Sequence, residues 1–217
     1  MLESQFWPIL WLSLQVSATA VLVSSLIGIP VGAWLGLSDS RLNSIPFVVV
    51  YTGMALPPVV VGLGLYVLLS RGGPLAFLGL LFTPQAMIVA QVILSLPFVM
   101  GITMNAVAAV PRELAPQLRS LGATENQVRL TVLREARHGV LLAVAAAFGR
   151  SVSEVGAVLI VGGNIQGHTR VLTTAVVLET SKGRFAFALT LGAALLTLAV
   201  LVNVLILRLR ERPPRHE

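Results

Sequence analysis

The sequence contains no cysteine and a single lysine in 217 residues, and charged residues make up only 11% of it. Without cysteine the chain forms no disulfide, uses no thiolate nucleophile and offers no thiolate to a metal. The low charged fraction argues against a soluble protein, because soluble proteins carry about 25% charged residues. Long polar tracts are also missing, which argues against a disordered chain. Together these absences exclude an ordinary water-soluble domain.

The sequence is instead rich in apolar residues. Apolar residues make up 56% of the chain, and the mean hydropathy is +0.89. We therefore predict an all-α integral membrane protein, with residues 1–217 forming one transmembrane domain in contact with lipid. The net charge is +6, which in a soluble protein would suggest nucleic acid. In a membrane protein it indicates basic loops beside the spans, so no nucleic-acid partner is expected.

Uncharged stretches predict about five transmembrane helices. The first stretch, 4–38, is too long for one crossing of about 30 Å and too short for two crossings with a turn. We interpret Phe6–Gln15 as an interfacial entry and Val16–Leu37 as the span, with two crossings as the alternative. A short apolar hairpin-like segment is expected over Gly72–Pro84. The other predicted spans are Ile45–Leu69, Gln85–Val107, His138–Gly162 and Phe185–Leu207.

Small residues and prolines mark special positions inside these spans. Gly28, Gly32 and Gly36 repeat every four residues, which predicts a helix face that another helix approaches closely. Pro57 and Pro58 interrupt the second span, either as a functional break or as a tolerated kink.

Basic residues are distributed unequally between the two sides of the membrane. Ten arginines fall on one side and four basic residues on the other, with Arg150 inside a span. By the positive-inside rule the ten-residue side is cytoplasmic, which puts the N-terminus outside and the C-terminus inside. The ten are Arg41, Arg112, Arg119, Arg129, Arg134, Arg137, Arg208, Arg210, Arg212 and Arg215, and the four are Arg71, Arg170, Lys182 and Arg184.

The cytoplasmic segment Pro111–Arg137 is longer than an ordinary connection of about 2–8 residues between helices. Its pattern predicts two amphipathic helices separated by Gly122. Pro111 suits the first position of the first helix, in which apolar residues recur at helical spacing, and Glu125–Arg137 forms the second. The segment either lies on the bilayer or docks a cytoplasmic partner. The recurring apolar residues of the first helix are Leu114, Leu118 and Leu121.

Leu114–Ala123 reads Leu-Ala-Pro-Gln-Leu-Arg-Ser-Leu-Gly-Ala and resembles the cytoplasmic loop of type I ABC-importer permeases. In that family the loop forms coupling helices that sit in a cleft of the ATPase subunit. Gly122 matches the family's glycine, whereas Pro116-Gln117-Leu118 replaces its Glu-Ala-Ala triplet and Arg134-Glu135 its later Leu-Pro. The resemblance implies docking through Glu113, Leu118, Arg119, Leu121, Gly122 and Ala123.

A second stretch narrows the resemblance. Glu154-Val-Gly followed by Gly162-Gly-Asn, within Phe148–Asn164, is similar to oxyanion-importer permeases for molybdate and sulfate. The whole chain looks most like the tungstate-transporter permeases, with molybdate or another oxyanion as the alternative substrate.

This resemblance implies a type I ABC-importer permease fold in a bacterial or archaeal cytoplasmic membrane. It further implies a homodimer with one translocation path. Two ATPase subunits would use ATP and Mg, while this chain carries no cofactor of its own. An extracytoplasmic oxyanion-binding protein would deliver the substrate.

Polar residues within and after the fourth span are candidates for the translocation path. Arg150 and Glu154 stand four residues apart, so on one helix they share a face and neutralise each other. They either line or gate the path, because charges in a span are costly, or form a structural ion pair. Beyond the span, His168, Arg170 and several threonines offer donors to a tetrahedral dianion, or the threonines cap the next helix. The predicted path residues are Arg150, Ser153, Glu154, Gly156, Asn164, Thr169 and Arg170.

Enzymatic motifs are absent from the sequence. The sole lysine, Lys182, lies between Ser181 and Gly183, so the chain has no Walker A loop of its own. It has neither a His-Glu-x-x-His nor a Gly-x-Ser-x-Gly motif. No catalytic or metal site is therefore expected, and a passive channel and an intramembrane hydrolase are the less favoured alternatives.

Overall fold

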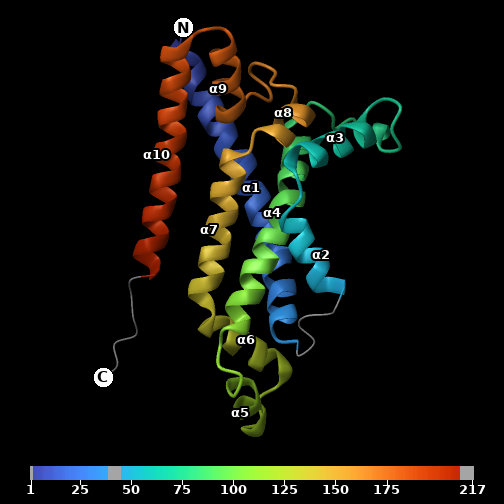
Figure 1. Ribbon diagram of the computed structural model, residues 1–217, viewed down its shortest axis with the longest axis vertical. Coiled ribbons are helices and arrows are strands. Elements are labelled where there is room, and N and C mark those ends of the chain that lie inside the picture. Colours follow the sequence, from blue (N-terminus) through green and yellow to red (C-terminus); the bar gives the residue numbers. More distant parts are fainter. Residues whose placement is uncertain (1, 39–44, 211–217) are drawn as a thin grey trace.

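The computed structural model describes residues 2–38 and 45–210, which form an elongated bundle of helices (Figure 1). Within these ranges the chain is helical and has no strand. The helices are α1 (Leu2–Gly36), α2 (Ile45–Met54), α3 (Pro58–Leu69), η1 (Ala76–Leu78), α4 (Pro84–Ala108), α5 (Leu114–Ser120), α6 (Glu125–Glu135), α7 (Arg137–Ser153), α8 (Gly156–Gly162), α9 (Leu172–Ser181) and α10 (Phe185–Arg210).

Three of the described helices are long and apolar enough to cross a membrane, and the number rises to five if each of two bent pairs counts as one span. The three contain Phe6–Gly36, Pro84–Ala108 and Phe185–Val202. The predicted all-α membrane architecture with about five spans is thus confirmed.

Residues 2–36 form a single helix, whereas the sequence left open whether they make one or two crossings. Helix α1 continues without a break over 35 residues, because neither a charge after Glu3 nor a turn interrupts it, and Pro8 and Pro30 are accommodated inside it. Phe6–Gln15, predicted as an interfacial entry, forms the first turns of the same helix as the predicted span, so no turn separates the two segments. Two crossings are likewise excluded. Trp7 and Trp11 are exposed near its beginning.

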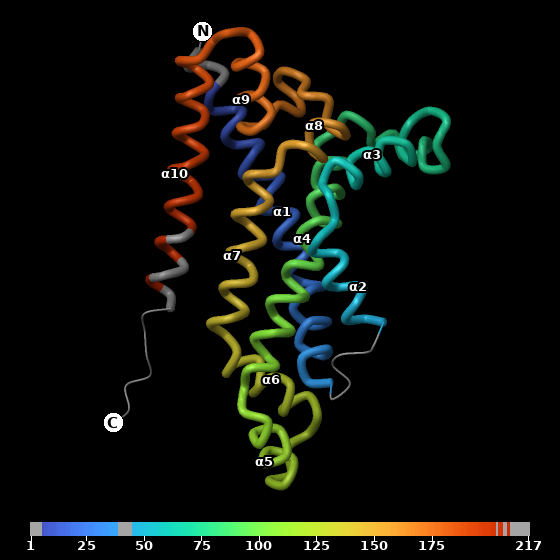
Figure 2. The backbone as a smooth tube through the Cα atoms, viewed as in Figure 1, coloured from blue at the N-terminus to red at the C-terminus, as the bar shows by residue number. Residues whose placement is uncertain are grey.

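The second predicted span is two helices rather than one. Helices α2 and α3 meet at 99°. Pro57 and Pro58 lie at the break, with Pro58 at the first position of α3, where its missing N–H needs no helical acceptor. Pro57-Pro58 is therefore a full break and not a tolerated kink. Helix α3 consequently projects sideways from the bundle (Figure 2).

The fourth predicted span is also broken. Helix α7 ends at Ser153, and α8 begins at Gly156 at an angle of 57°. No proline lies at this break. The two bent pairs meet each other, because a Cβ on Gly62 of α3 would lie 2.8 Å from the Cα of Ala157 in α8. Only glycine at position 62 permits this approach.

Helix α1 packs along α4 through its predicted glycine face. A Cβ on Gly32 would lie 2.5 Å from the carbonyl oxygen of Met100, and one on Gly36 would lie 2.7 Å from that of Met104. The glycines therefore bring the two longest central helices into backbone contact, as their spacing predicted.

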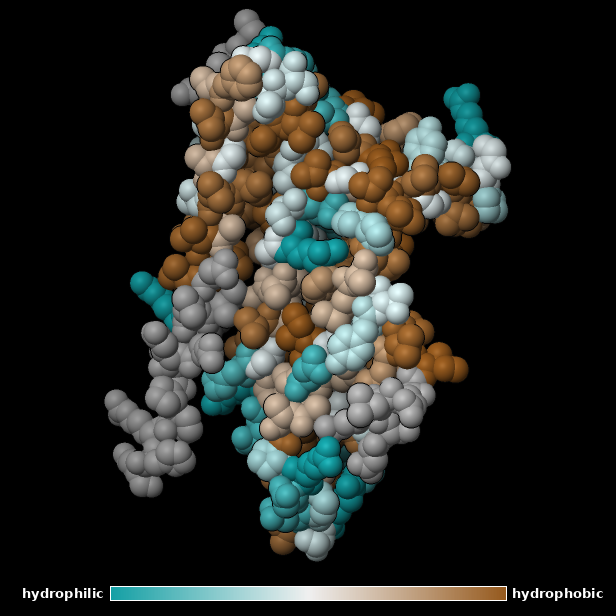
Figure 3. All heavy atoms as spheres, in the orientation of Figure 1, coloured by the Kyte–Doolittle hydropathy of each residue, from teal (hydrophilic) through white to brown (hydrophobic). Residues whose placement is uncertain are grey.

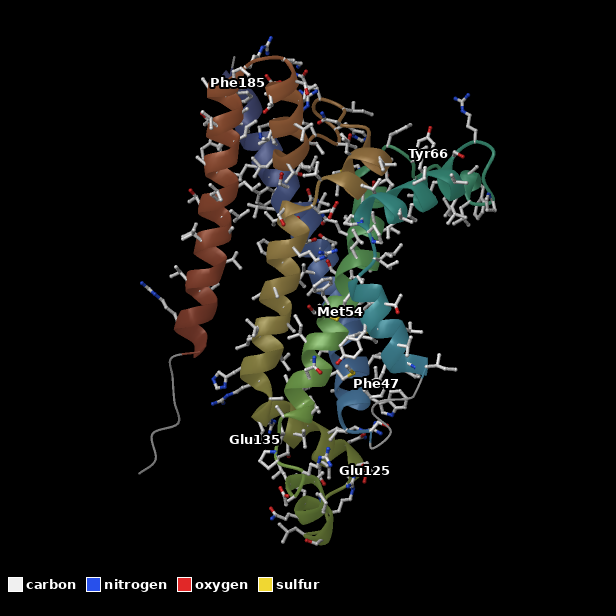
Figure 4. All side chains as sticks on the ribbon, in the orientation of Figure 1. Phe47, Met54, Tyr66, Glu125, Glu135 and Phe185 are labelled. Atoms are coloured by element: carbon white, nitrogen blue, oxygen red, sulfur yellow. The ribbon has the colours of Figure 1, made fainter. Side chains whose placement is uncertain are left out.

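The two ends of the bundle carry different elements. The α5–α6 hairpin extends from one end along the long axis, whereas α3, α8 and α9 gather toward the other end (Figure 1). Figure 4 shows Glu125 and Glu135 at the hairpin end and Phe185 at the opposite one. This separation places the predicted docking segment and the predicted outer loop at opposite ends of the molecule.

Candidate coupling hairpin and translocation path

The predicted docking segment folds as a compact helical hairpin. Helix α5 begins at Leu114 with Glu113 as its N-cap, so Pro111 precedes the helix and does not occupy its first position. At the other end Gly122 has φ +85°, a left-handed conformation that favours glycine. Its N–H donates to the Arg119 carbonyl (2.9 Å) and the Ala123 N–H donates to the Leu118 carbonyl (3.0 Å). This pair of bonds is the Schellman motif, which ends α5 and turns the chain back.

The second helix of the hairpin is capped at its start. The Thr124 hydroxyl accepts from the Gln127 N–H (3.4 Å), and the Thr124 N–H donates to the Gln127 side-chain oxygen (2.8 Å). These reciprocal bonds form a capping box. Arg119 in α5 also pairs with Glu125 in α6 at 2.7 Å, and this hydrogen bond lowers the pKa of the Glu125 carboxyl. The two helices and the turn are therefore held as one unit.

The apolar residues of the hairpin divide between its core and its tip. Leu114 and Leu118 pack against fully buried Val128 and against Val132. Leu121, predicted as the third apolar residue of the first helix, instead lies beyond the helix end and is 84% exposed. All six predicted coupling residues nevertheless lie on this one hairpin. The hairpin end of the molecule is largely hydrophilic on the face shown in Figure 3.

Arg150 and Glu154 do not form the predicted pair. Arg150 is in the last turn of α7, whereas Glu154 lies after the helix end in extended conformation (φ −70°, ψ 130°), so the two do not share a helix face. No ion pair between them occurs in the described structure. Instead the Arg150 guanidinium lies over the Phe98 ring of α4, 4.3 Å from its centroid. Its Nε is buried and makes no hydrogen bond.

Glu154 stabilises the break between α7 and α8. Its Oε1 accepts the Ala157 N–H at 3.1 Å, which satisfies a free donor at the start of α8. Its backbone carbonyl accepts the Thr173 hydroxyl of α9 at 2.9 Å. Gly156 lets α3 approach, because a Cβ there would lie 2.8 Å from Cγ2 of Val59. The neighbouring Ser153 hydroxyl donates to the Gly149 carbonyl (2.9 Å) within α7.

The threonines after α8 bind backbone groups. The buried Thr169 hydroxyl donates to the Gly162 carbonyl (2.5 Å) and accepts the Ile165 N–H (2.9 Å). Thr174 exchanges hydrogen bonds with the backbone of Val171 at the start of α9. These bonds support the capping interpretation of the threonines rather than contact with an anion. Asn164 adopts φ 51° and donates to the Thr174 carbonyl at 3.4 Å.

Arg170 borders a cavity of about 230 Å³ between α1 and the loop after α8. Its Nη2 donates to the Asn164 carbonyl at 3.4 Å, while its Nε is buried without a hydrogen-bond partner. His168 and Gln166 line the same cavity, opposite Pro8 and Ile9. The cavity thus combines donors with an apolar wall, and Arg150 does not border it.

Three residues that contact the last turn of α7 or belong to it were missed by the sequence prediction. Phe98 supplies the ring beneath the guanidinium. Gln91 of α4 and Ser151 of α7 are both buried and bond reciprocally: Gln91 Nε2 donates to the Ser151 carbonyl and the Ser151 hydroxyl donates to Gln91 Oε1, each at 2.9 Å. The polar side chain of Gln91 within an uncharged span was the available signal, whereas nothing local marks Phe98.

A family model described as "Binding-protein-dependent transport system inner membrane component" matches residues 28–212. The chain belongs to this family of membrane permeases. A probable anion ABC transporter permease protein of Haloferax volcanii is 45% identical, with 93% of this chain and 89% of that protein covered. The tungstate uptake system permease protein TupB of Peptoclostridium acidaminophilum is 40% identical (96% and 92% covered). The molybdenum transport system permease protein ModB of Azotobacter vinelandii is 32% identical (88% and 88% covered).

Solved structures agree on the fold. An inward-facing structure of the MetNI methionine ABC transporter superposes with a TM-score of 0.78 at 22% identity and covers 96% of this chain and 97% of that chain. The type I ABC-importer permease fold predicted from the sequence is therefore confirmed, and the chain is a multi-pass membrane permease subunit.

Proposed function

We propose that this permease imports an oxyanion, with tungstate as its substrate and molybdate as the alternative. The tungstate permease TupB is 40% identical and the molybdenum permease ModB is 32% identical over similar shares of the chain. These relatives support the class of substrate, and the contacts of Arg150 supply a physical basis for it.

The unpaired guanidinium of Arg150 is the observation that carries the proposal. A charge within a membrane span is costly and faces protein or a water-filled path. Arg150 has no acidic partner within reach in the described structure, and its Nε is buried without a hydrogen bond. Hydrophilic side chains also gather about halfway along the face shown in Figure 3. A tetrahedral dianion would supply the charge and the acceptors that the guanidinium lacks.

The remaining predicted path residues take different parts in this proposal. Glu154 and Gly156 hold the α7–α8 break, and Ser153 lies directly before it. Asn164 and Thr169 shape the outer loop that carries Arg170. Arg170 and His168 would meet the anion on the outer side, whereas Arg150 would meet it within the membrane.

Coupling to ATP would pass through the α5–α6 hairpin. Two ATPase subunits, which use ATP and Mg, would each take one hairpin of a homodimer, with Leu121 as an apolar contact. Only Ala136 separates α6 from α7, so movement of the hairpin shifts the helix that carries Arg150 at its far end. Closing of the ATPases on ATP would thus move Arg150 and the α7–α8 break together, which suits alternating access.

The second copy and the binding protein occupy other surfaces in this proposal. Helix α3 stands out from the bundle and exposes apolar side chains, which suits burial against a second protomer. The hairpin end would be cytoplasmic, and the end with α8 and α9 would receive an extracytoplasmic oxyanion-binding protein. The exposed side chains of α3 include Val59, Val60, Leu63 and Val67.

Reconstitution tests the proposed function. The permease, its ATPase and its binding protein in proteoliposomes should take up tungstate only with ATP, with molybdate as a competitor and sulfate as a comparison. Uptake without ATP would indicate a passive channel, and peptide or ester cleavage by the permease alone would indicate a hydrolase. Either result would contradict the proposal.

A further inference from the structure

The break between α7 and α8 leaves one backbone carbonyl of α7 without its helical donor. Glu154, directly after α7, is extended (φ −70°, ψ 130°), and this conformation turns the chain away from the helix axis. In a continuing helix the Ser151 carbonyl would accept the N–H of Val155, four residues later. Because Ser151 is buried, its carbonyl needs a donor from elsewhere in the protein.

Gln91 of α4, which lies beside α7 (Figure 1), supplies this donor. Its Nε2 donates to the Ser151 carbonyl at 2.9 Å, whereas the Glu154 N–H reaches the same carbonyl at 3.3 Å. The Ser151 hydroxyl donates back to Gln91 Oε1 at 2.9 Å, and both residues are buried. The side chain of Gln91 thus takes the place that the Val155 N–H would have in a continuing helix.

The break also decides which partners Arg150 and Glu154 have. Glu154 Oε1 accepts the Ala157 N–H at 3.1 Å, and the Arg150 guanidinium lies over the ring of Phe98. If the helix continued through position 154, the two charged residues would stand four apart on one face, where a carboxylate and a guanidinium attract each other. An anion would then have to displace Glu154 from the guanidinium. The break therefore keeps the charge of Arg150 available.

We propose that Gln91 is a positioning residue for anion import: its bond to the Ser151 carbonyl holds the α7–α8 break and so keeps Glu154 away from Arg150. The inference rests on the proposed function, in which Arg150 meets the anion within the membrane. Gln91 acts through Arg150 and not on the anion, since its amide oxygen and nitrogen are both engaged by Ser151. Phe98, which lies under the guanidinium, is seven residues after Gln91, so α4 holds both the arginine and the break.

Gln91→Leu tests the break without any transport measurement. Leucine is of similar size but donates nothing, so the Ser151 carbonyl regains a full partner only if the helix continues to Val155. Spin labels on cysteines at Leu142 of α7 and Ile165 after α8, both exposed, report the bend in the purified permease–ATPase complex. Straightening the 57° bend should lengthen the distance between the labels by roughly 3 Å, from a rise of about 1.5 Å per residue on each side. An unchanged distance would overturn the proposal.

Tungstate uptake tests the consequence for Arg150. Gln91→Leu should lower uptake by roughly tenfold, because Glu154 then competes for the guanidinium, while the ATPase still co-purifies. Adding Glu154→Gln should restore most of the uptake, because the amide carries no charge, whereas a merely structural role of Gln91 predicts no such rescue. Ser95→Ala is the matched control and should change neither the bend nor uptake. It removes a buried hydroxyl of α4, four residues after Gln91, that has no hydrogen-bond partner in the part of the chain that the structure describes.

The two measurements separate this inference from the proposed function. If the unchanged complex imports no oxyanion, or if Arg150→Met imports tungstate normally, the proposed function fails, and the label distance still decides whether Gln91 holds the break. If Arg150→Met is impaired but Gln91→Leu imports tungstate at the unchanged rate, the proposed function stands and the positioning role is overturned. Failure of Glu154→Gln to rescue Gln91→Leu overturns it as well.

Discussion

The guanidinium of Arg150 lies over the ring of Phe98, with Cζ 4.3 Å from the ring centroid. A cation above an aromatic face is attracted by the negative charge of the ring, and the contact leaves the edge of the guanidinium free to donate. Glu154, four residues later, is turned to the start of α8. The two charges that the sequence suggested as a pair therefore have separate partners and separate tasks.

Replacing Arg150 should lower the rate of transport strongly without preventing assembly. Arg150→Met keeps an apolar side chain over Phe98 but removes every donor, and a hydrogen bond to a charged group contributes about 1.5–3 kcal/mol. We expect Arg150→Met to lower tungstate uptake by roughly ten- to a hundredfold. Uptake by Arg150→Lys should lie between that of Arg150→Met and that of the unchanged protein. Uptake in proteoliposomes measures transport, and size-exclusion chromatography of the complex with its ATPase measures assembly. Full uptake by a well-expressed Arg150→Met protein would remove Arg150 from the path.

Glu154 should tolerate an amide but not truncation. Glu154→Gln keeps an oxygen that accepts the Ala157 N–H, whereas Glu154→Ala loses the cap and should lower the free energy of unfolding by about 1 kcal/mol. Because no ion pair joins the two residues, Glu154→Gln should not rescue Arg150→Met. Thermal unfolding and uptake of the single and double variants check this. A stable but inactive Glu154→Gln protein would instead show that its negative charge acts in the path.

Gly122 should be required for docking of the ATPase. A valine at φ +85° is strongly disfavoured, and the Schellman turn would reorganise, although nothing near Gly122 would clash with a Cβ. Gly122→Val should therefore insert into the membrane but fail to co-purify with the ATPase. Gly122→Asn is the matched control, since asparagine tolerates the left-handed conformation. The docking role is refuted by a Gly122→Val complex that forms and transports normally.

The orientation can be measured directly, because the chain has no native cysteine. A cysteine at Gln166, which is exposed after α8, should react with an impermeant thiol reagent in intact cells. One at Ser120, in the α5–α6 hairpin, should react only after the membrane is opened. The reverse pattern would place the hairpin outside and exclude its contact with a cytoplasmic ATPase.

Gly32 should be essential for packing of α1 against α4. A Cβ there would lie 2.5 Å from the carbonyl oxygen of Met100, whereas one on Gly192 of α10 would meet nothing within 4 Å. Gly32→Ala should lower the free energy of unfolding by about 1–3 kcal/mol through overpacking, and Gly192→Ala should not. Unfolding in detergent with added denaturant compares the two. Equal stability of the two variants would contradict the prediction, because it would show that α1 can move away from α4 at little cost in free energy.

The sequence by itself determined the features that depend on local chemistry. Low charge and long apolar runs require a membrane environment, and the glycine spacing of α1 creates a face for close packing wherever a partner helix lies. The left-handed glycine at position 122, with Thr124 and Gln127 after it, ends one helix and starts the next. These outcomes need only neighbours along the chain, which is why pattern and spacing predicted the membrane class, the glycine face and the turn at Gly122, and why the Thr124–Gln127 cap, which was not predicted, is also local.

Tertiary structure decided the outcomes that depend on distant neighbours. The α7–α8 break contains no proline and is held by Val59 and Gly62 of α3 and by Thr173 of α9, which no local pattern places beside it. The partner of Arg150 is likewise Phe98 on another helix, because the break turns Glu154 away. A helical repeat tells which residues share a face only while the helix continues. Where it ends is set here by the helices that pack against it.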